Sequence, residues 1–198
     1  MVDEDGAPSQ PAEQLEAEEG YIKTAANNYV SRSASIHGSR HVEIRGKSVV
    51  RPGAVVRGDL GAPVRVGRYC RVGDRSVLRP PSASLPDGTE RRLPQSIGNH
   101  TSIGRDCVVE AAAVGFSVLV GDGCVLGKRS VIKDCCRIEP GTVLAPDAVV
   151  PPFSIVSGSP GRVVGEMPES AAAEIPDRSL GEYAAFVKER REEELSAR

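Results

Sequence analysis

Tryptophan is absent from this sequence of 198 residues, and aromatic residues together make up only 4% of it. Most globular cores use aromatic side chains to fill the space between layers of secondary structure. A chain that largely avoids them is expected to have a narrow, regular interior filled by small and branched aliphatic side chains. Glycine and proline, by contrast, are plentiful, with 21 and 15 residues.

The sequence also lacks a strong excess of either charge. Its formal net charge of -2 gives no basic field that would attract nucleic acid or an anionic membrane surface. It has no apolar run of about 18 residues that would span a membrane. The N-terminus has no basic region followed by an apolar stretch, so we expect no secretory signal. We therefore expect a cytoplasmic chain that binds no nucleic acid and does not insert directly into membranes.

Basic residues are missing from the first part of the chain. Residues 1–19 contain seven acids and no lysine or arginine, together with Pro8 and Pro11. Such a segment buries too little apolar surface to fold alone, which predicts a disordered acidic N-terminal tail. A docking peptide for a basic partner is the alternative.

Aliphatic residues recur in the central part of the chain at a strict interval of six. This period fits neither an α-helix nor an ordinary alternating strand. It fits a short strand and a corner, repeated, with three such units closing one triangular coil. Stacked coils then pair their strands in parallel and bury a continuous aliphatic column. The longest unbroken run comprises Val114, Val120, Leu126, Ile132, Ile138, Leu144, Val150 and Val156.

A second phase of the repeat supports this geometry. A small residue follows each aliphatic by four positions, as at Cys70, Ser76 and Thr101, and is expected to point inward beside the corner. Glycine often follows the aliphatic directly, as at Gly73 and Gly104, where it is expected to relieve the backbone at the bend. The sequence therefore predicts an all-β fold, a left-handed parallel β-helix of hexapeptide repeats.

The interval of six is broken most widely between Leu78 and Ile97. Because residues 80–96 are rich in proline, serine and glycine, we expect them to form a loop that leaves one corner between coils. We assign residues 20–165 to the β-helix and residues 166–198 to a C-terminal helical segment.

A C-terminal α-helix is predicted from two local signals. Ser179 and Glu182 have the spacing of a capping box, which marks the start of a helix. Tyr183, Phe186 and Val187 follow at helical spacing, so we expect this face to pack on the outside of the coil stack. A helix that binds a partner is the alternative.

Repeats of this kind are typical of γ-class carbonic anhydrases and hexapeptide acyltransferases. Within that γ-carbonic anhydrase-like group, the chain resembles the dynactin subunit 5 family over roughly residues 20–168. The segments that carry the resemblance are YIKTAANNYVSR (21–32), VVRGDL (55–60), RSVLRPP (75–81), KDCC (133–136) and VPPF (150–153).

This resemblance implies a non-enzymatic structural subunit of the dynactin pointed-end complex, which caps the actin-related filament. It implies as partners dynactin subunit 6, the pointed-end actin-related protein and dynactin subunit 4. It also implies a surface that docks dynein cargo adaptors and so links dynein to membrane cargo in microtubule-based transport. The expected location is then the cytoplasm and its cytoskeleton.

A γ-class carbonic anhydrase is one enzymatic alternative. Such an enzyme needs three histidines that hold a metal with an open position for water. Alignment with that family places its ligand positions on Arg79, Gly104 and Val109, none of which is a suitable ligand. Arg57 and Asp59 match the family's RGD turn, and we interpret them as a turn and interface ion pair. We expect no catalytic residue, metal or cofactor.

A diverged hexapeptide acyltransferase is the second enzymatic alternative. It needs a histidine base at a cleft between subunits and a groove for coenzyme A or a similar carrier. The sequence offers only His37, His41 and His100. We expect His100 to be a solvated corner residue and the other two to be solvated residues of the first coil.

The five cysteines, an odd number in a chain without a signal, are expected to be reduced. Cys70, Cys107, Cys124 and Cys136 occupy the small inward phase and are interpreted as filler of the core. Cys135 is out of phase and is expected to face outward. Adjacent cysteines do not form a zinc knuckle, which needs two intervening residues.

Basic residues of the early coils are the candidate partner-binding site. Several arginines in adjacent coils are expected to form a stripe for acidic adaptor segments. The uncovered strand edges of the end coils further predict that the chain needs its sister subunit to fold well. The candidate residues are Arg57 with its acidic neighbour Asp59, and Arg68, Arg71, Arg75 and Arg79.

Overall fold

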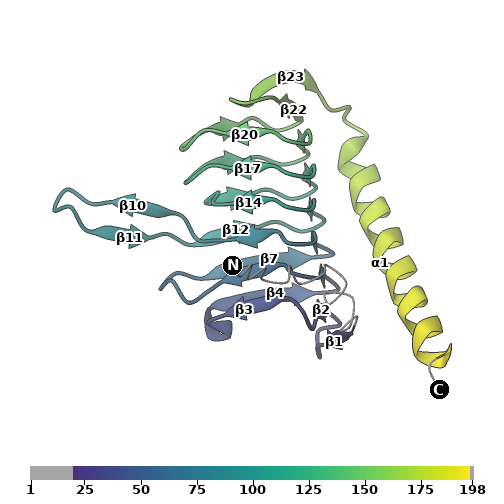
Figure 1. The fold of residues 1–198 in the computed structure, drawn as a ribbon. Coiled ribbons are helices and arrows are strands. Elements are labelled where there is room, and N and C mark those ends of the chain that lie inside the picture. Colours follow the sequence, from purple (N-terminus) through teal and green to yellow (C-terminus); the bar gives the residue numbers. More distant parts are fainter. Residues whose placement is uncertain (1–19, 197–198) are drawn as a thin grey trace, which may run out of the picture.

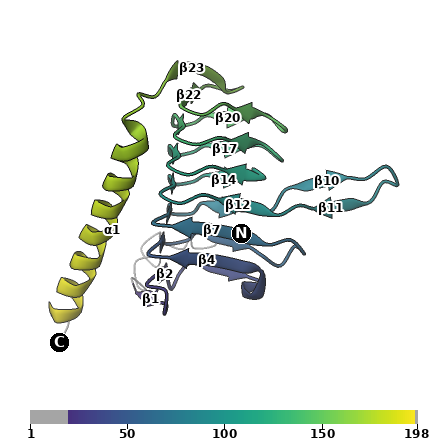
Figure 2. The ribbon, with the colours of Figure 1, turned by 180° about the vertical axis from the view of Figure 1, so that it is seen from behind.

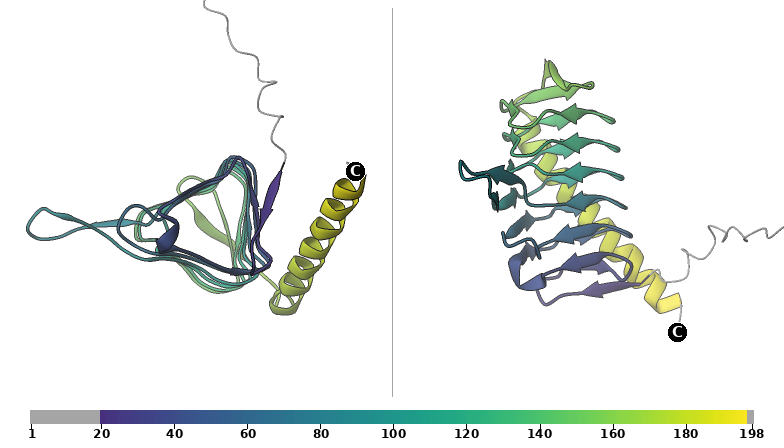
Figure 3. Two further views of the ribbon diagram at one scale, coloured as in Figure 1. Left: turned by 90° about the horizontal axis from the view of Figure 1, so that it is seen from below. Right: turned by 60° about the vertical axis from the view of Figure 1, so that its left-hand side comes forward.

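The computed structural model describes residues 20–196 as a stack of short strands flanked by one long helix (Figure 1). The expected acidic tail, residues 1–19, lies outside the described residues. Seen along the stack, the coils superpose as a triangle (Figure 3). The predicted fold class, a left-handed parallel β-helix of hexapeptide repeats with a C-terminal helix, is confirmed.

Each side of the triangle is one sheet, in which neighbouring strands come from successive coils. The first face contains β1 (Tyr21–Lys23), β2 (Tyr29–Ser31), β5 (Val49–Val50), β8 (Arg71–Val72), β13 (Ser102–Ile103), β16 (Leu119–Val120), β19 (Arg137–Ile138), β22 (Ser154–Ser157) and β23 (Arg162–Glu166). The second face contains β4 (Val42–Gly46), β7 (Val64–Arg68), β12 (Gln95–Ile97), β15 (Ala113–Val114), β18 (Val131–Ile132) and β21 (Val149–Val150). The third face contains β3 (Ser35–His37), β6 (Val55–Arg57), β9 (Val77–Leu78), β14 (Val108–Val109), β17 (Val125–Leu126) and β20 (Val143–Leu144).

Strand pairing within the stack is parallel, as the repeat predicts, except at the two ends of the first face. There β1 pairs antiparallel with β2, and β23 pairs antiparallel with β22. The chain therefore covers both ends of its first face with its own strands. A short 3-10 turn, η2 (Ser39–His41), joins β3 to β4.

The aliphatic residues at the interval of six form the core. Leu78, Val109 and Leu126 on the third face are fully buried. Within residues 20–196, the core cluster inside the triangle contains no aromatic side chain. The scarcity of aromatic residues in the sequence is thus a consequence of the narrow interior.

The small inward residues have a second role, because many of them donate a hydrogen bond to a glycine carbonyl in the next coil. Ser76 Oγ donates to the carbonyl of Gly104 at 2.6 Å, and Cys70 Sγ donates to that of Gly98 at 3.0 Å. Such bonds explain why this phase takes serine, threonine and cysteine. The same contact joins Ser48 to Gly67, Thr101 to Gly115 and Cys107 to Gly121.

The glycines that follow the aliphatics do not relieve a bend, and that expectation is wrong. They permit the close approach of the next coil: a Cβ on Gly73 would lie 2.2 Å from the carbonyl oxygen of Gly104. The left-handed backbone conformation falls two residues later, mostly on residues that carry side chains. Arg75 has a φ of 55° and His100 a φ of 58°.

The segment expected to be a loop is a β-hairpin. Strands β10 (Ser82–Ser84) and β11 (Glu90–Arg92) pair antiparallel, and the hairpin projects from the corner opposite to the helix (Figure 3). Gln95 falls within the expected loop, residues 80–96, but it is buried in β12. Its Nε2 donates to the carbonyls of Val109 and Ala111 at 2.9 and 3.0 Å. Because Gln95 is polar, the aliphatic periodicity does not predict its place in the core.

The C-terminal helix, α1 (Ala171–Ser196), begins before the expected capping box. Ser179 is an interior helix residue, and its hydroxyl contacts His100 and the carbonyl of Pro176 rather than a free amide. From the far end of the stack α1 runs back along the first face toward the N-terminal coils (Figures 1 and 2). Within the described part of the chain, no helix is long and apolar enough to cross a membrane.

The close approach of the coils predicts that alanine substitution changes stability in opposite directions at two glycines. Gly73→Ala is expected to destabilise the fold by about 2–3 kcal/mol, because the new methyl group meets backbone that cannot move. Gly181→Ala, in the middle of α1 with open space around it, is expected to stabilise it by about 0.5–1 kcal/mol. Denaturant unfolding of both variants measures the difference, and equal stabilities would contradict the close-approach explanation.

Candidate functional site

An aromatic cluster holds α1 against the first face. The ring of Phe186 meets Tyr21 and Tyr29 edge to face, with centroids 5.1 and 5.4 Å apart. Tyr183 meets Tyr69 at 5.8 Å in the same manner. All four tyrosines of the sequence lie in this contact, outside the triangle. The expectation that the aromatic face of the helix packs on the outside of the stack is confirmed.

His100 lies at the centre of this contact. Its Nδ1 is 2.6 Å from Ser179 Oγ on α1, and its ring stacks on Tyr69 at a centroid distance of 5.3 Å. His100 lies at a corner, as expected, but it is half-buried rather than solvated. The repeat does not reveal that a helix covers this corner. Burial lowers the pKa of His100, which favours the neutral imidazole. His37 and His41 are exposed, as expected.

A cavity of about 510 Å³ separates α1 from the first face. Apolar side chains line its floor and its helical wall, among them Leu119, Ile175 and Phe186. Arg51 and Arg71 line it as well, together with Glu182 and Glu189 of α1, so the cavity is apolar with charges of both signs in its wall. We interpret it as a surface for contacts. Ser179 and His100 meet in its wall, but the Ser179 hydroxyl donates its proton to the carbonyl of Pro176 at 2.8 Å, so His100 does not activate it as a nucleophile.

Three of the candidate arginines have carboxylate partners. Arg57 binds Asp59 through two hydrogen bonds of 2.8 and 2.9 Å, which forms the turn ion pair expected for this sequence. Arg75 binds Asp106 in the same two-pronged way at 2.7 Å. Arg79 pairs with Glu110. These side chains tie one coil to the next or close a turn.

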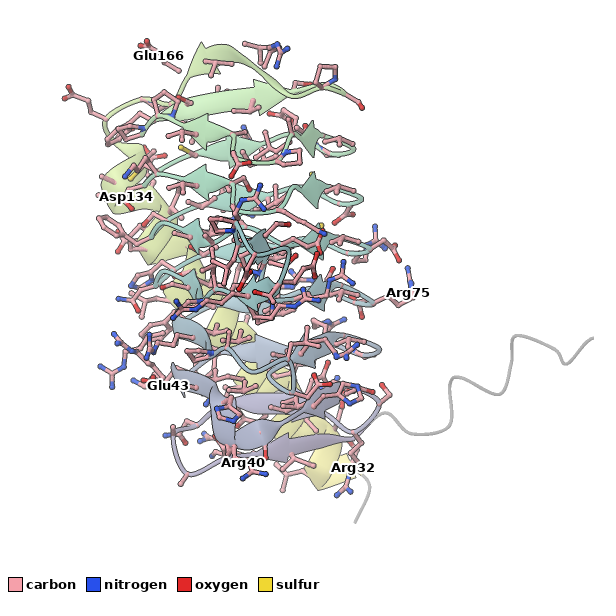
Figure 4. All side chains as sticks on the ribbon, turned by 90° about the vertical axis from the view of Figure 1, so that its left-hand side faces the viewer. Arg32, Arg40, Glu43, Arg75, Asp134 and Glu166 are labelled. Carbon is pink, nitrogen blue, oxygen red and sulfur yellow. The ribbon has the colours of Figure 1, made fainter. Side chains whose placement is uncertain are left out.

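The candidate arginines do not form a stripe. Arg68 ends β7 on the second face, Arg71 lies in β8 on the first face, and Arg79 follows β9 on the third face. Arg75 projects from a corner of the stack, where Figure 4 labels it. The expectation fails because most of these residues belong to one coil, which turns through all three faces. Within residues 20–196, no ion pair involves Arg68 or Arg71.

The positions aligned with carbonic anhydrase ligands are structural in this chain. Arg79 is paired with Glu110, Gly104 packs closely on Asp122, and Val109 is fully buried in the core. Among the residues that the structure describes, no group of three histidine, cysteine or acidic side chains is arranged to hold a metal ion. The donor set that such a site needs is therefore missing from these positions.

Four cysteines occupy the core as predicted, and the fifth does not follow the prediction. Cys70, Cys107, Cys124 and Cys136 are buried, and burial raises the pKa of the Cys70 thiol to about 11. Cys135 is also buried, with 2% of its surface exposed, so the outward orientation expected for it is wrong. Cys135 lies in the same column of corner residues as His100. At a corner, side chains do not alternate between inward and outward as they do along a strand.

Comparison with known protein families identifies this scaffold. The family model for Dynactin subunit 5 matches residues 10–189. The chain belongs to the dynactin subunit 5 family. Dynactin subunit 5 of Dictyostelium discoideum is 41% identical over 95 residues, which cover 48% of this chain and 47% of that protein. The match thus spans about half the length of that relative.

Proteins of other families have lower sequence identity to this chain. A probable carbonic anhydrase of Methanocaldococcus jannaschii is 29% identical over 155 residues, which cover 66% of this chain and 87% of that protein. The N-acyltransferase AntD from Bacillus cereus has a TM-score of 0.53 at 11% identity and covers 87% of this chain and 96% of its own. A hexapeptide transferase family protein from Anaplasma phagocytophilum has a TM-score of 0.50 at 18% identity, with coverage of 80% and 90%. At such identities the two solved structures indicate the fold alone.

The contact between His100 and α1 predicts a dependence on pH. Because burial lowers the pKa of His100, its contribution to docking is complete above about pH 6.5, the ordinary histidine value. It is lost as the pH falls through the lowered pKa, since the undocked form binds the proton more readily. Hydrogen exchange of the α1 amides should therefore accelerate at acidic pH.

The same contact is tested by substitution at constant pH. His100→Ala should speed exchange in α1 about fivefold at pH 7.5, as expected when one hydrogen bond of about 1 kcal/mol is lost. His41→Ala, at an exposed position of η2, serves as the matched control. Equal exchange in the two variants would contradict a role for His100 in docking.

Proposed function

We propose that this chain is a non-enzymatic structural subunit of the dynactin pointed-end complex. In this role it helps cap the actin-related filament, beside dynactin subunit 6, dynactin subunit 4 and the pointed-end actin-related protein, in the cytoplasm at the cytoskeleton. The observation that carries the proposal is the family match over residues 10–189. Identity to the Dictyostelium protein of the same family adds to it.

The absence of an enzymatic role is part of the proposal. Arginine, glycine and valine stand at Arg79, Gly104 and Val109, where a γ-class carbonic anhydrase needs histidines. An acyltransferase would need His100 as a base. In this chain His100 stacks on Tyr69 and forms a hydrogen bond with Ser179. The acyltransferases of similar fold therefore offer a weaker alternative, which a large thermal shift with acetyl-coenzyme A would favour.

Exposed apolar residues at the far end of the stack support a role in an assembly. Val149 of β21 is 64% exposed, and Val163 and Val164 of β23 are 54% and 63% exposed. These two strands end their sheets, so they also present unpaired backbone groups. A surface with both features is suited to contact a neighbouring subunit, in line with the expectation that the chain depends on a partner.

Affinity purification of the tagged full-length chain from its own cell extract tests the assembly. We expect mass spectrometry to find the other pointed-end subunits and the actin-related filament in near-stoichiometric amounts. Recovery of a homotrimer without these subunits would contradict the proposal and favour the acyltransferase.

We also propose that the early coils dock acidic segments of dynein cargo adaptors. Of the six candidates, Arg57, Asp59, Arg75 and Arg79 have partners in the fold. This leaves Arg68 and Arg71 as the charges best suited to bind an external acid. Arg71 is the stronger candidate, because it also lines the cavity under α1.

Charge reversal at Arg71 tests adaptor docking within the intact complex. Arg71→Glu should weaken co-purification of adaptors about tenfold while the pointed-end subunits remain bound, because an attractive charge becomes a repulsive one. Arg45→Glu, at an exposed arginine of the second face, is the matched control. Unchanged adaptor recovery at physiological salt would contradict the docking site without affecting the assembly proposal.

A further inference from the structure

A second hollow, of about 380 Å³, lies between α1 and the first coils on the side of β1. Its charged lining residues are all cations: Lys23 at the end of β1, Lys47 before β5, and Lys188 and Arg191 on α1. Tyr29 and Tyr183 line the space between them. We call these six residues the lysine cleft. Segments far apart in the sequence thus bring four positive charges to one place.

Among the side chains that the structure describes, these charges are largely uncompensated. Lys188 approaches Glu192 at 3.8 Å, but both side chains are mostly exposed, so the pair is weak. Lys23 and Lys47 lie over tyrosine rings, 5.8 Å from the centroid of Tyr29 and 5.3 Å from that of Tyr69. Aromatic rings attract the ammonium groups without neutralising them. A concave surface whose charged residues are all positive concentrates an electric field that attracts anions.

The chain carries the complementary charge next to this cleft. Residues 1–19 hold seven acids and no lysine or arginine. They lead into Gly20, directly before β1, and β1 ends at Lys23. Three residues span at most about 10 Å, so the acidic segment starts within that distance of the cleft. Nineteen residues are long enough to turn back and reach all four cations.

We propose that residues 1–19 bind the lysine cleft of the same molecule through their carboxylates. A tether this short gives an effective concentration on the order of millimolar. Ionic contacts that are weak individually are therefore sufficient to keep the segment bound at physiological salt. The bound segment neutralises the cations on β1 and α1 together, and an external acidic ligand has to displace it. This inference does not depend on the proposed role in dynactin.

Paramagnetic relaxation in the full-length chain tests the proposal directly. The five native cysteines are buried, so Ser9→Cys offers one reactive thiol for a nitroxide label within the acidic segment. At 50 mM salt we expect the label to broaden the amide signals of Lys188 and Arg191 strongly. The amides of β23, at the far end of the stack, should be unaffected. At 500 mM salt the broadening should fall at least threefold, since screening shortens the range of the attraction.

Two sets of variants separate this interaction from random encounters. Lys23→Glu with Lys47→Glu should reduce the broadening at least fivefold, as should glutamine in place of Glu13, Glu16, Glu18 and Glu19. Lys128→Glu with Lys133→Glu makes the same change of charge in distant coils and should have no effect. Equal broadening in all variants, or none in the parent chain, would overturn the proposal.

A mixture of labelled and isotopically enriched chains distinguishes binding within one molecule from binding between two. Broadening that persists in the mixture would identify a second copy as the source and overturn binding in cis. If the segment stays free while polyglutamate shifts the signals of the cleft, the occupant is an external acidic partner, and the proposal is likewise wrong.

Discussion

The close stacking of successive coils is the constraint on which the rest of this structure depends. Parallel strands lie about 4.8 Å apart, so a side chain at the wrong corner position meets the backbone of the next coil, as a methyl group on Gly73 would. The same spacing lets Ser76 and Cys70 donate to glycine carbonyls one coil further on. It also keeps aromatic rings out of the triangle and leaves room only for branched aliphatics. The close spacing of the coils therefore explains why glycine, small polar residues and aliphatics each recur at a fixed position of the repeat.

The surface of the stack is free of this constraint, and the distinguishing features of the chain are found there. The four tyrosines and Phe186 gather between α1 and the first face, where Phe186 packs on Tyr21 and Tyr29, and Tyr183 packs on Tyr29 and Tyr69. His100 takes part in this contact through Ser179 and Tyr69. In this chain the outer surface of the stack holds a helix and presents charge. That use suits a subunit whose task is assembly.

Much of the fold could be predicted from the sequence, because the hexapeptide period is a direct record of the stacking. The inward aliphatics and four of the five cysteines followed from phase alone. The outward orientation expected for Cys135 is wrong, since this residue lies at a corner. The solvation expected for His100 is wrong because the position of α1 is not encoded in the repeat. The arginines were expected to form a stripe, but the coil carries Arg68, Arg71 and Arg79 onto three different faces. Gln95 was missed because its partners are backbone carbonyls, which leave no pattern in a sequence.

The most direct test of the assembly claim is an electron cryomicroscopy map of the complex purified through this chain at native expression level. The account predicts a triangular β-helix at one end of an actin-related filament, recognisable by the hairpin of β10 and β11 opposite to α1. A map in which the filament end lacks this chain, or in which the chain forms a free symmetric trimer, would contradict it.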